Sequence, residues 1–137
     1  MAAANGEVRV AVETDSDIVL ARQRGRELAE QYGFRGVDLI VIATAISEIA
    51  RNIVSYATRG EVLLRGEQQG GRHGIVVIAR DEGPGVEDIE LAMEDGYSTA
   101  EGLGLGLPGA RRLMDEFEIV SSPGAGTTVT MRKWVPA

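Results

Sequence analysis

Two polar side chains interrupt a long apolar segment of the sequence, and their types and spacing could support chemistry. Glu48 and Asn52 are four residues apart, so on a helix they lie along one stripe, about 40° from each other. A carboxylate and an amide among apolar neighbours are unfavourable unless each finds a partner. A structural interpretation is an internal polar bond, to Arg51 or Tyr56. A functional interpretation makes Asn52 an oxygen ligand for Mg2+ and Glu48 a base or an orienter of metal-bound water.

A second candidate is a carboxylate at the end of an expected strand. Asp81 is followed by two glycines, Gly83 and Gly85. A carboxylate in this position can accept a hydrogen bond from an exocyclic amine, and the glycines allow a flat base to lie against the backbone. The same Asp-x-Gly-x-Gly pattern also forms ordinary turns, so on its own it leaves both interpretations open.

The third candidate is a glycine-rich segment, 102–109. Gly104, Gly106 and Gly109 match the dinucleotide fingerprint G-x-G-x-x-G. That fingerprint requires a preceding strand, and residues 95–101 are polar and unlike a strand. The sequence has a single lysine, close to its C-terminus, so neither a P-loop nor the glycine loop of a protein kinase can be assembled with its lysine. What remains is a loop before a helix whose free amides suit phosphate.

The elements that must position these residues follow from hydrophobic periodicity and from cap and turn residues. Alternation predicts strands at 7–13, 61–65, 75–80, 117–121 and 127–134. Apolar spacing of three and four predicts helices at 15–33, 37–57, 86–93 and 108–114. The polar stretch 95–107 is expected to be a mobile loop. Because strands and helices interleave without strict β-α-β alternation, an α/β fold with helices on one face of a mixed sheet is expected.

Composition excludes several other classes of protein. The chain has 137 residues and a net charge of -7, so we expect one domain with no general attraction to nucleic acid or to an anionic membrane surface. The absence of cysteine and the single histidine remove thiolate sites and most histidine metal sites. The sequence shows no signal-peptide pattern and no apolar run of about 18 residues, so a cytoplasmic protein is expected.

The order of the motifs is more specific than any one of them. Glu-x3-Asn on a helix, Asp-x-Gly-x-Gly after a strand, Gly-x-Gly-x-Gly before a helix and Gly-Thr in a last strand follow one another. This order resembles the GHKL ATPase superfamily of gyrase, histidine kinases and MutL. Residues 46–52, 81–85 and 93–117 are similar to the anti-sigma-factor serine/threonine kinases, and among these to the stressosome switch kinases. The resemblance spans nearly the whole chain.

The resemblance implies a Bergerat-type ATP-binding fold, an α+β two-layer sandwich that holds ATP and Mg2+ between a helix and a lid. Carried over by position, it implies that Asn52 ligates Mg2+, that Glu48 is the general base toward a substrate hydroxyl, and that Asp81 accepts a hydrogen bond from the adenine amine. It also implies nucleotide-binding roles for Thr127, through water to Asp81 and adenine, for Gly83 and Gly85 beside the base, and for Gly102, Gly104 and Gly106 around the phosphates.

The implied activity is phosphorylation of STAS-domain partner proteins on serine or threonine, by a single GHKL kinase domain spanning 1–137. The partner is bound before and after transfer, which implies partner switching in bacterial stress signalling. Stressosome components are the implied substrates, and a downstream signalling enzyme is activated by the released kinase. Two alternatives stay open: a non-catalytic protein that sequesters its partner under the control of ATP, and the ATP-binding fragment of a histidine kinase. Glu48 beside Asn52 favours the enzyme.

Overall fold

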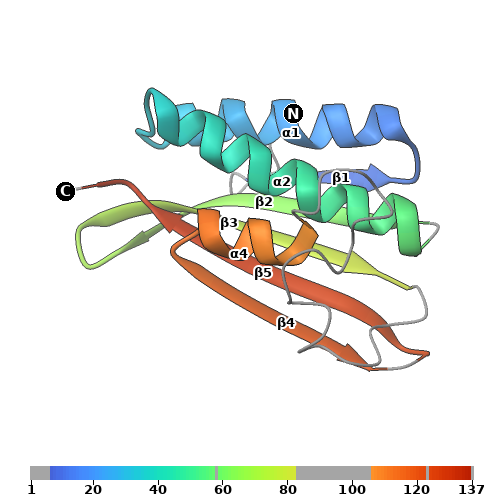
Figure 1. Cartoon of the computed structure of the whole chain (residues 1–137). Coiled ribbons are helices and arrows are strands. Elements are labelled where there is room, and N and C mark those ends of the chain that lie inside the picture. The colour runs from blue at the N-terminus through green and yellow to red at the C-terminus, as the bar shows by residue number, and fades with distance from the viewer. Residues whose placement is uncertain (1–6, 58, 83–105, 123, 137) are drawn as a thin grey trace.

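The computed structural model describes residues 7–57, 59–82, 106–122 and 124–136, which form two layers (Figure 1). One layer is a five-stranded sheet made of β1 (Val8–Val12), β2 (Gly60–Gln69), β3 (Arg72–Asp81), β4 (Glu116–Ser122) and β5 (Gly126–Trp134). The other layer contains α1 (Asp15–Gln31), α2 (Val37–Tyr56) and α4 (Gly106–Leu113). All three helices lie on one face of the sheet, so the predicted two-layer sandwich is confirmed. The helix expected at 86–93 and the loop expected at 95–107, up to residue 105, lie outside the described residues.

The sheet differs from the mixed one that the sequence predicts, because every described pairing is antiparallel. The strand order is β1-β2-β3-β5-β4. Two helices, rather than one, connect β1 to β2. In a parallel crossover a single helix brings the chain back so that the next strand runs in the same direction. The second helix reverses the chain again, so β2 runs antiparallel to β1. Strands β3 and β4 do run in the same direction, but β5 lies between them and pairs with both.

The hairpin of β2 and β3 is longer than predicted. The sequence predicts a connection over 66–74, yet the ladder continues from Gly66 opposite Ile75 to Gln69 opposite Arg72. The turn itself consists of Gly70 and Gly71, both with positive φ, at 58° and 81°. Two residues of positive φ match the twist of the flanking strands, so the polar residues beside the turn stay in the ladder.

Helix α1 begins where the sequence predicts because Asp17 bonds back to the residues before it. Its carboxylate Oδ2 accepts hydrogen bonds from the backbone N–H groups of Glu13, at 2.8 Å, and of Thr14, at 3.1 Å. These bonds lower the pKa of the Asp17 carboxyl from its ordinary value of 3.8, because they favour the charged form. The start of α1 is thus fixed by a charged capping residue.

Helices α1 and α2 pack closely because α1 has a glycine where they meet. A Cβ atom built on Gly25 would overlap Cδ1 of Ile46 in α2, so a larger residue would push the helices apart. Four isoleucines of α2 are at most 2% exposed: Ile42, Ile46, Ile49 and Ile53. They form one core cluster with the inward side chains of the sheet and of α4, which makes α2 the central helix of the fold.

The opposite face of the sheet is covered by its own side chains. Val76 of β3 has 0% exposure, although its pairing with Arg65 and Arg132 places it on the face that no described helix covers. Arginine stems pack along apolar surface while the charged ends stay in water. The charged ends form ion pairs there: Arg9–Glu61, Arg65–Glu7, Arg80–Glu61, Arg132–Glu67 and Arg132–Glu116. Asp81 and Thr127 lie on the other face of the sheet, toward the helices.

Candidate functional site

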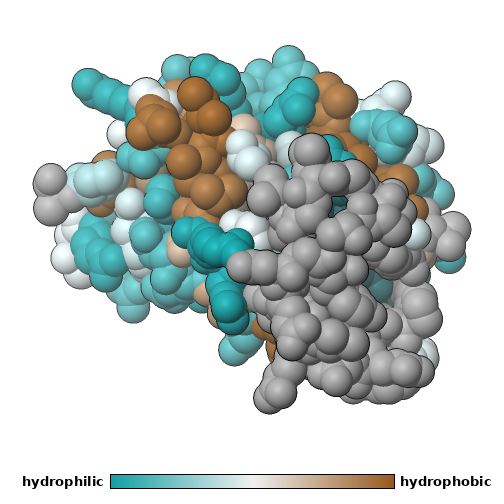
Figure 2. All heavy atoms as spheres, viewed as in Figure 1, coloured by the Kyte–Doolittle hydropathy of each residue, from teal (hydrophilic) through white to brown (hydrophobic). Residues whose placement is uncertain are grey.

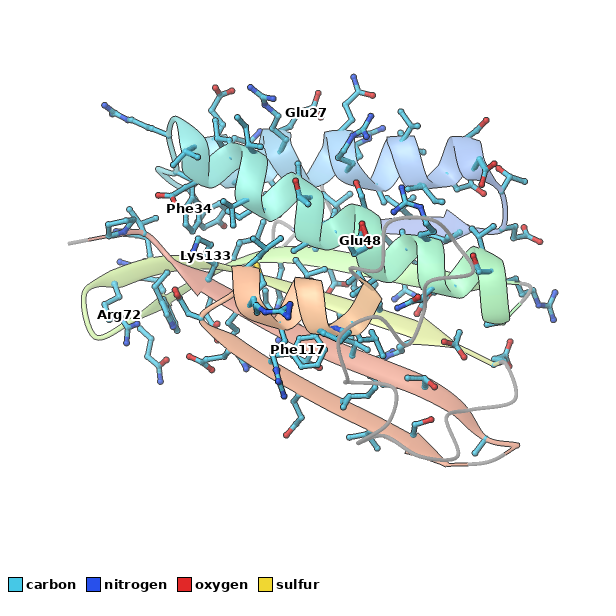
Figure 3. All side chains as sticks on the ribbon, viewed as in Figure 1. Glu27, Phe34, Glu48, Arg72, Phe117 and Lys133 are labelled. Atoms are coloured by element: carbon cyan, nitrogen blue, oxygen red, sulfur yellow. The ribbon has the colours of Figure 1, made fainter. Side chains whose placement is uncertain are left out.

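Glu48 lies in the buried part of α2. It is 6% exposed and its neighbour Ser47 is 7% exposed, and these two are the buried polar or charged residues among the described parts of the chain. The Ser47 hydroxyl donates a hydrogen bond to the carbonyl of Ala43, at 2.9 Å, so it is satisfied within the helix. Figure 3 shows Glu48 on the part of α2 that lies beside the start of α4. A buried carboxylate at this place needs a charged partner.

Arg51 is that partner. Its Nη1 atom donates a hydrogen bond to Oε1 of Glu48, at 2.9 Å, from a position three residues further along the same helix. The Glu48 side chain is 7% exposed and the Arg51 side chain 38%. Because a buried carboxylate without a countercharge is strongly unfavourable, this ion pair offsets much of the cost of burying Glu48. The internal bond to Arg51, one of the two partners suggested by the sequence, is confirmed.

Asn52 follows directly and is half-buried, one helical turn after Glu48. A half-buried amide remains partly accessible from solvent. A side chain that coordinates a hydrated cation needs this accessibility. The expected stripe of a carboxylate and an amide on one helix is therefore present in α2.

Asp81 is the last residue of β3 and lies opposite Thr127 of β5. The backbone N–H of Thr127 donates to Oδ1 of Asp81, at 3.2 Å, and the Thr127 hydroxyl lies 2.8 Å from the Ser121 hydroxyl of β4. The structure thus brings together Asp81 and Thr127, as the family resemblance implies, and adds a direct bond between them. Sequence reasoning missed Ser121, whose only signal is its register opposite Thr127 across two strands.

Gly126, at the start of β5, allows the chain to pass closely over Asp81. Its φ is 86°, and a Cβ built on it would overlap the carbonyl oxygen of Asp81. A residue with a side chain is disfavoured here both by the positive φ and by the space. The Gly-Thr pair of the sequence therefore has a structural reason: the glycine permits the approach, and Thr127 makes the hydrogen bond.

A second glycine, Gly60 of β2, shows how α2 sits above this strand end. A Cβ built on Gly60 would touch both Cγ2 of Ile53, at 2.9 Å, and Cα of Asp81, at 3.1 Å. Ile53 is the next residue after Asn52. The turn of α2 that carries Asn52 therefore packs over the end of β3 that carries Asp81, and the two parts of the predicted site belong to one region.

Of the five glycines predicted to bind nucleotide, one lies within the described residues. Gly106 is the first residue of α4, two residues before the predicted start, and α4 packs against α2. The amides of a first helical turn have no partner within the helix, so they can bind an anion. Gly83, Gly85, Gly102 and Gly104 lie outside the described residues.

A magnesium ion fits the donor set only with help from phosphate and water. Within the described ranges, no group of three or more His, Cys, Asp or Glu residues could hold a metal. Mg2+ commonly takes one or two protein oxygens and completes its shell with waters and substrate phosphates. The amide oxygen of Asn52 suits that limited role.

The helices of the described segments include none that is long and apolar enough to cross a membrane.

Comparison with known proteins gives the family. Residues 6–133 match the model of the histidine kinase-like ATPase domain. The chain is 49% identical to the serine/threonine-protein kinase RsbT of Bacillus subtilis over 131 residues, which are 96% of this chain and 98% of that protein. It is also 37% identical over 100 residues to the anti-sigma F factor of Thermoanaerobacter sp., covering 69% of this chain and 68% of that one.

These likenesses confirm the enzyme class that the sequence predicts. A full-length match to a serine/threonine kinase, together with an ATPase-domain match over most of the chain, makes this protein an ATP-using serine/threonine kinase. The motif order that resembles the GHKL superfamily and the two-layer fold agree with that class. The chain belongs to the histidine kinase-like ATPase domain family.

Proposed function

We propose that this protein phosphorylates STAS-domain partners on serine or threonine and acts by partner switching in bacterial stress signalling, in the cytoplasm and as one domain spanning 1–137. The observation that carries the proposal is Glu48: it is buried at 6% exposure and ion-paired, and Asn52 and the strand end with Asp81 lie within the same region. A protein that only sequestered its partner would need no carboxylate there. The likeness to the kinase RsbT and to anti-sigma factors supports a serine/threonine kinase that acts on partner proteins.

In the proposed site, separate residues bind the base and the phosphates of the nucleotide. Asp81 accepts a hydrogen bond from the adenine amine, and Thr127 holds the Asp81 carboxylate in place and supports the base through water. Gly83 and Gly85 leave room for the base. The amides of Gly102, Gly104 and Gly106, the last of these at the start of α4, bind the phosphates.

Glu48 is the general base of the transfer. It takes the proton of the substrate hydroxyl while the hydroxyl oxygen forms a bond to the γ-phosphorus, and the bond from that phosphorus to the bridging oxygen breaks, leaving the electron pair on ADP. When bound, Mg2+ neutralises charge on the phosphates, and Asn52 would hold it.

The helix layer also exposes large apolar side chains that a protein partner could cover. Val19 and Leu20 of α1 are 49% and 40% exposed, and Val37 and Ile40 of α2 are 68% and 57% exposed. Figure 2 shows hydrophobic side chains in separate groups, at the upper left and the upper right of the helix layer. These residues form two exposed apolar groups, one near the start of each helix, and each group is proposed as a contact point for a protein partner. A STAS-domain substrate and, after its release, a downstream signalling enzyme are the proposed occupants in turn.

The test is transfer of labelled phosphate from ATP to a purified STAS-domain protein, with and without Mg2+, followed by identification of phosphoserine or phosphothreonine. Glu48→Gln should retain ATP affinity within a few-fold and slow transfer by roughly 10²- to 10⁴-fold. Transfer at the wild-type rate would remove Glu48 as the base. Tight partner binding that depends on ATP but gives no phosphorylated product would favour the non-catalytic alternative, and autophosphorylation of an attached histidine segment would favour the histidine kinase fragment.

A further inference from the structure

We propose that Arg51 is a positioning residue for the transfer, which fixes Glu48 through its Oε1 atom and leaves Oε2 to take the substrate proton. The inference rests on the proposed function, since it takes Glu48 as the base. It adds a residue outside the nucleotide and metal contacts and assigns separate roles to the two carboxylate oxygens.

Among the residues that the structure describes, the hydrogen bond from Arg51 is the polar contact recorded for the Glu48 carboxylate. Ile49, the next residue of α2, is 1% exposed, and the hydroxyl of adjacent Ser47 is bonded to its own helix. Apolar neighbours restrict where a carboxylate can go but do not hold it in one orientation. The charge-assisted bond from Arg51, at 2.9 Å, is directional and sets the rotation of the carboxylate.

The ion pair is also local, because both residues belong to α2 and are three positions apart. The pair therefore does not depend on contacts between elements, and a change in the arrangement of nucleotide or partner leaves it in place. The Arg51 side chain is 38% exposed, so its guanidinium keeps part of its hydration while one end reaches the buried carboxylate. These features suit a permanent support for a base.

The two oxygens of Glu48 are made unequal by this contact. Oε1 receives the N–H of a cation, which stabilises negative charge on that oxygen and makes it the weaker proton acceptor. The proton of the substrate hydroxyl is therefore assigned to Oε2. Loss of Arg51 would free the carboxylate to rotate, and a misplacement of about 1 Å in a reacting group can slow a reaction about 10²-fold.

The experiment is a double-mutant cycle on Glu48 and Arg51, read out as single-turnover transfer to the STAS-domain substrate and as ATP affinity by calorimetry. Arg51→Met should slow transfer about 10- to 100-fold, while the affinity for ATP and the KM for the STAS-domain substrate stay within a few-fold of wild type. Arg51→Lys keeps the charge and should recover part of the rate. In the Glu48→Gln background, Arg51→Met should change the rate less than about twofold, because a residue that acts through Glu48 has nothing left to act on.

Arg9→Met is the matched control. Arg9 pairs with Glu61 at 2.8 Å on the outer face of the sheet, so its loss removes a bond of similar length far from the site and should leave the transfer rate unchanged. Thermal unfolding, followed by the fluorescence of Trp134, reports whether each variant is folded. If Arg51→Met unfolds at the assay temperature, the rate of Arg51→Lys is compared with the wild type instead. Glu48→Gln is also compared with the double variant Glu48→Gln/Arg51→Met, in which glutamine removes the buried charge that would otherwise be unpaired.

The outcomes distinguish failure of the Arg51 positioning role from failure of the proposed kinase function. Equal transfer by wild type and folded Arg51→Met, or a further tenfold loss in the Glu48→Gln background, would overturn the positioning role while the proposed kinase function stands. Loss of ATP affinity in parallel with the rate would assign Arg51 to nucleotide binding and overturn it as well. Wild-type transfer by Glu48→Gln would overturn both the base and its positioning residue.

Discussion

In the proposed function, the Asp81 carboxylate accepts a hydrogen bond from the nucleotide base. Adenine has a donor at its exocyclic amine, whereas guanine has an acceptor oxygen at the equivalent position. Binding GTP would leave a carboxylate facing an oxygen, which disfavours GTP by at least about 1–3 kcal/mol, roughly a 5- to 150-fold weaker affinity. Calorimetric titration with the two nucleotides measures this difference, and equal affinities would contradict the role of Asp81.

Asp81→Asn is the informative variant at this position. Its side-chain oxygen can still accept the N–H of Thr127, which lies 3.2 Å from Oδ1 in the wild type, while its amide offers a donor toward the base. The preference for ATP over GTP should therefore shrink or reverse without a large change in stability. Asp81→Ala, which has no polar group, should instead weaken the binding of ATP.

Two glycines at the entry to strand β5, Gly124 before the strand and Gly126 at its first position, allow backbone strain to be distinguished from close approach. Gly124 and Gly126 both have positive φ, at 79° and 86°, but a Cβ on Gly124 meets nothing within 4 Å, whereas a Cβ on Gly126 overlaps the Asp81 carbonyl. Each alanine substitution should lower the free energy of unfolding by about 1–3 kcal/mol. Only Gly126→Ala should also displace Asp81 and weaken ATP binding, by tenfold or more. Chemical unfolding and calorimetry measure the two effects, and equal ATP affinities in the two variants would contradict this view of Gly126.

The start of helix α1 should make stability depend on pH in the acid range. The backbone N–H groups of Glu13 and Thr14 lower the pKa of the Asp17 carboxyl from its ordinary 3.8. A lowered folded-state pKa means that the stabilisation is complete well above 3.8 and is lost as the pH falls through the folded-state value. Asp17→Asn should therefore have a lower Tm than wild type at neutral pH, and the difference should close once the pH is below that value. A Tm difference that stays constant across the acid range would show that the charge of Asp17 does not matter.

The elements were predictable from sequence where one short-range pattern decides them. The apolar circumference of α2 and the alternation of β1 (Val8–Val12) place these two elements within a residue or two of the structure. The absence of a parallel pair among the described strands was not predictable, because it depends on β5 entering between β3 and β4. The length of the hairpin was also missed, because its last residues are polar and are kept in the ladder by a two-glycine turn.

The site shows the same limit. Glu48, Asn52 and Asp81 are visible in the sequence as polar residues at unusual places, whereas Thr127 is identified only through the family resemblance. The structure puts them on α2 and on the strand ends beneath it. The internal partner of the Glu48 and Asn52 pair stays open in the sequence between Arg51 and Tyr56. The spacing of three residues allows the bond from Arg51 to Glu48 that the structure shows, but does not require it. Ser121 was missed because its contact with Thr127 needs the register of two strands.

At the scale of the whole molecule, binding of Mg-ATP should raise the melting temperature, Tm. A ligand that binds only the folded state at 100 times its Kd adds about 2.7 kcal/mol, which for a domain of this size raises Tm by about 10 °C. Asn52→Ala should lose most of the part of this rise that depends on Mg2+ and keep the rise given by ATP with a chelator. Scanning calorimetry with both nucleotide forms measures the difference. An equal rise with and without Mg2+ in the wild-type protein would argue against a metal at Asn52.

The sheet face that bears the ion pairs offers a place for spectroscopic labels. Val120 of β4 is 62% exposed and lies opposite Thr128, on the side away from the helices. The chain has no cysteine, so Val120→Cys would introduce a unique thiol for a fluorophore or for attachment to a surface. Because nucleotide and partner are proposed to bind from the helix side, a dye or tether at this thiol would leave both free to bind, and exchange of partners could be followed on single immobilised molecules.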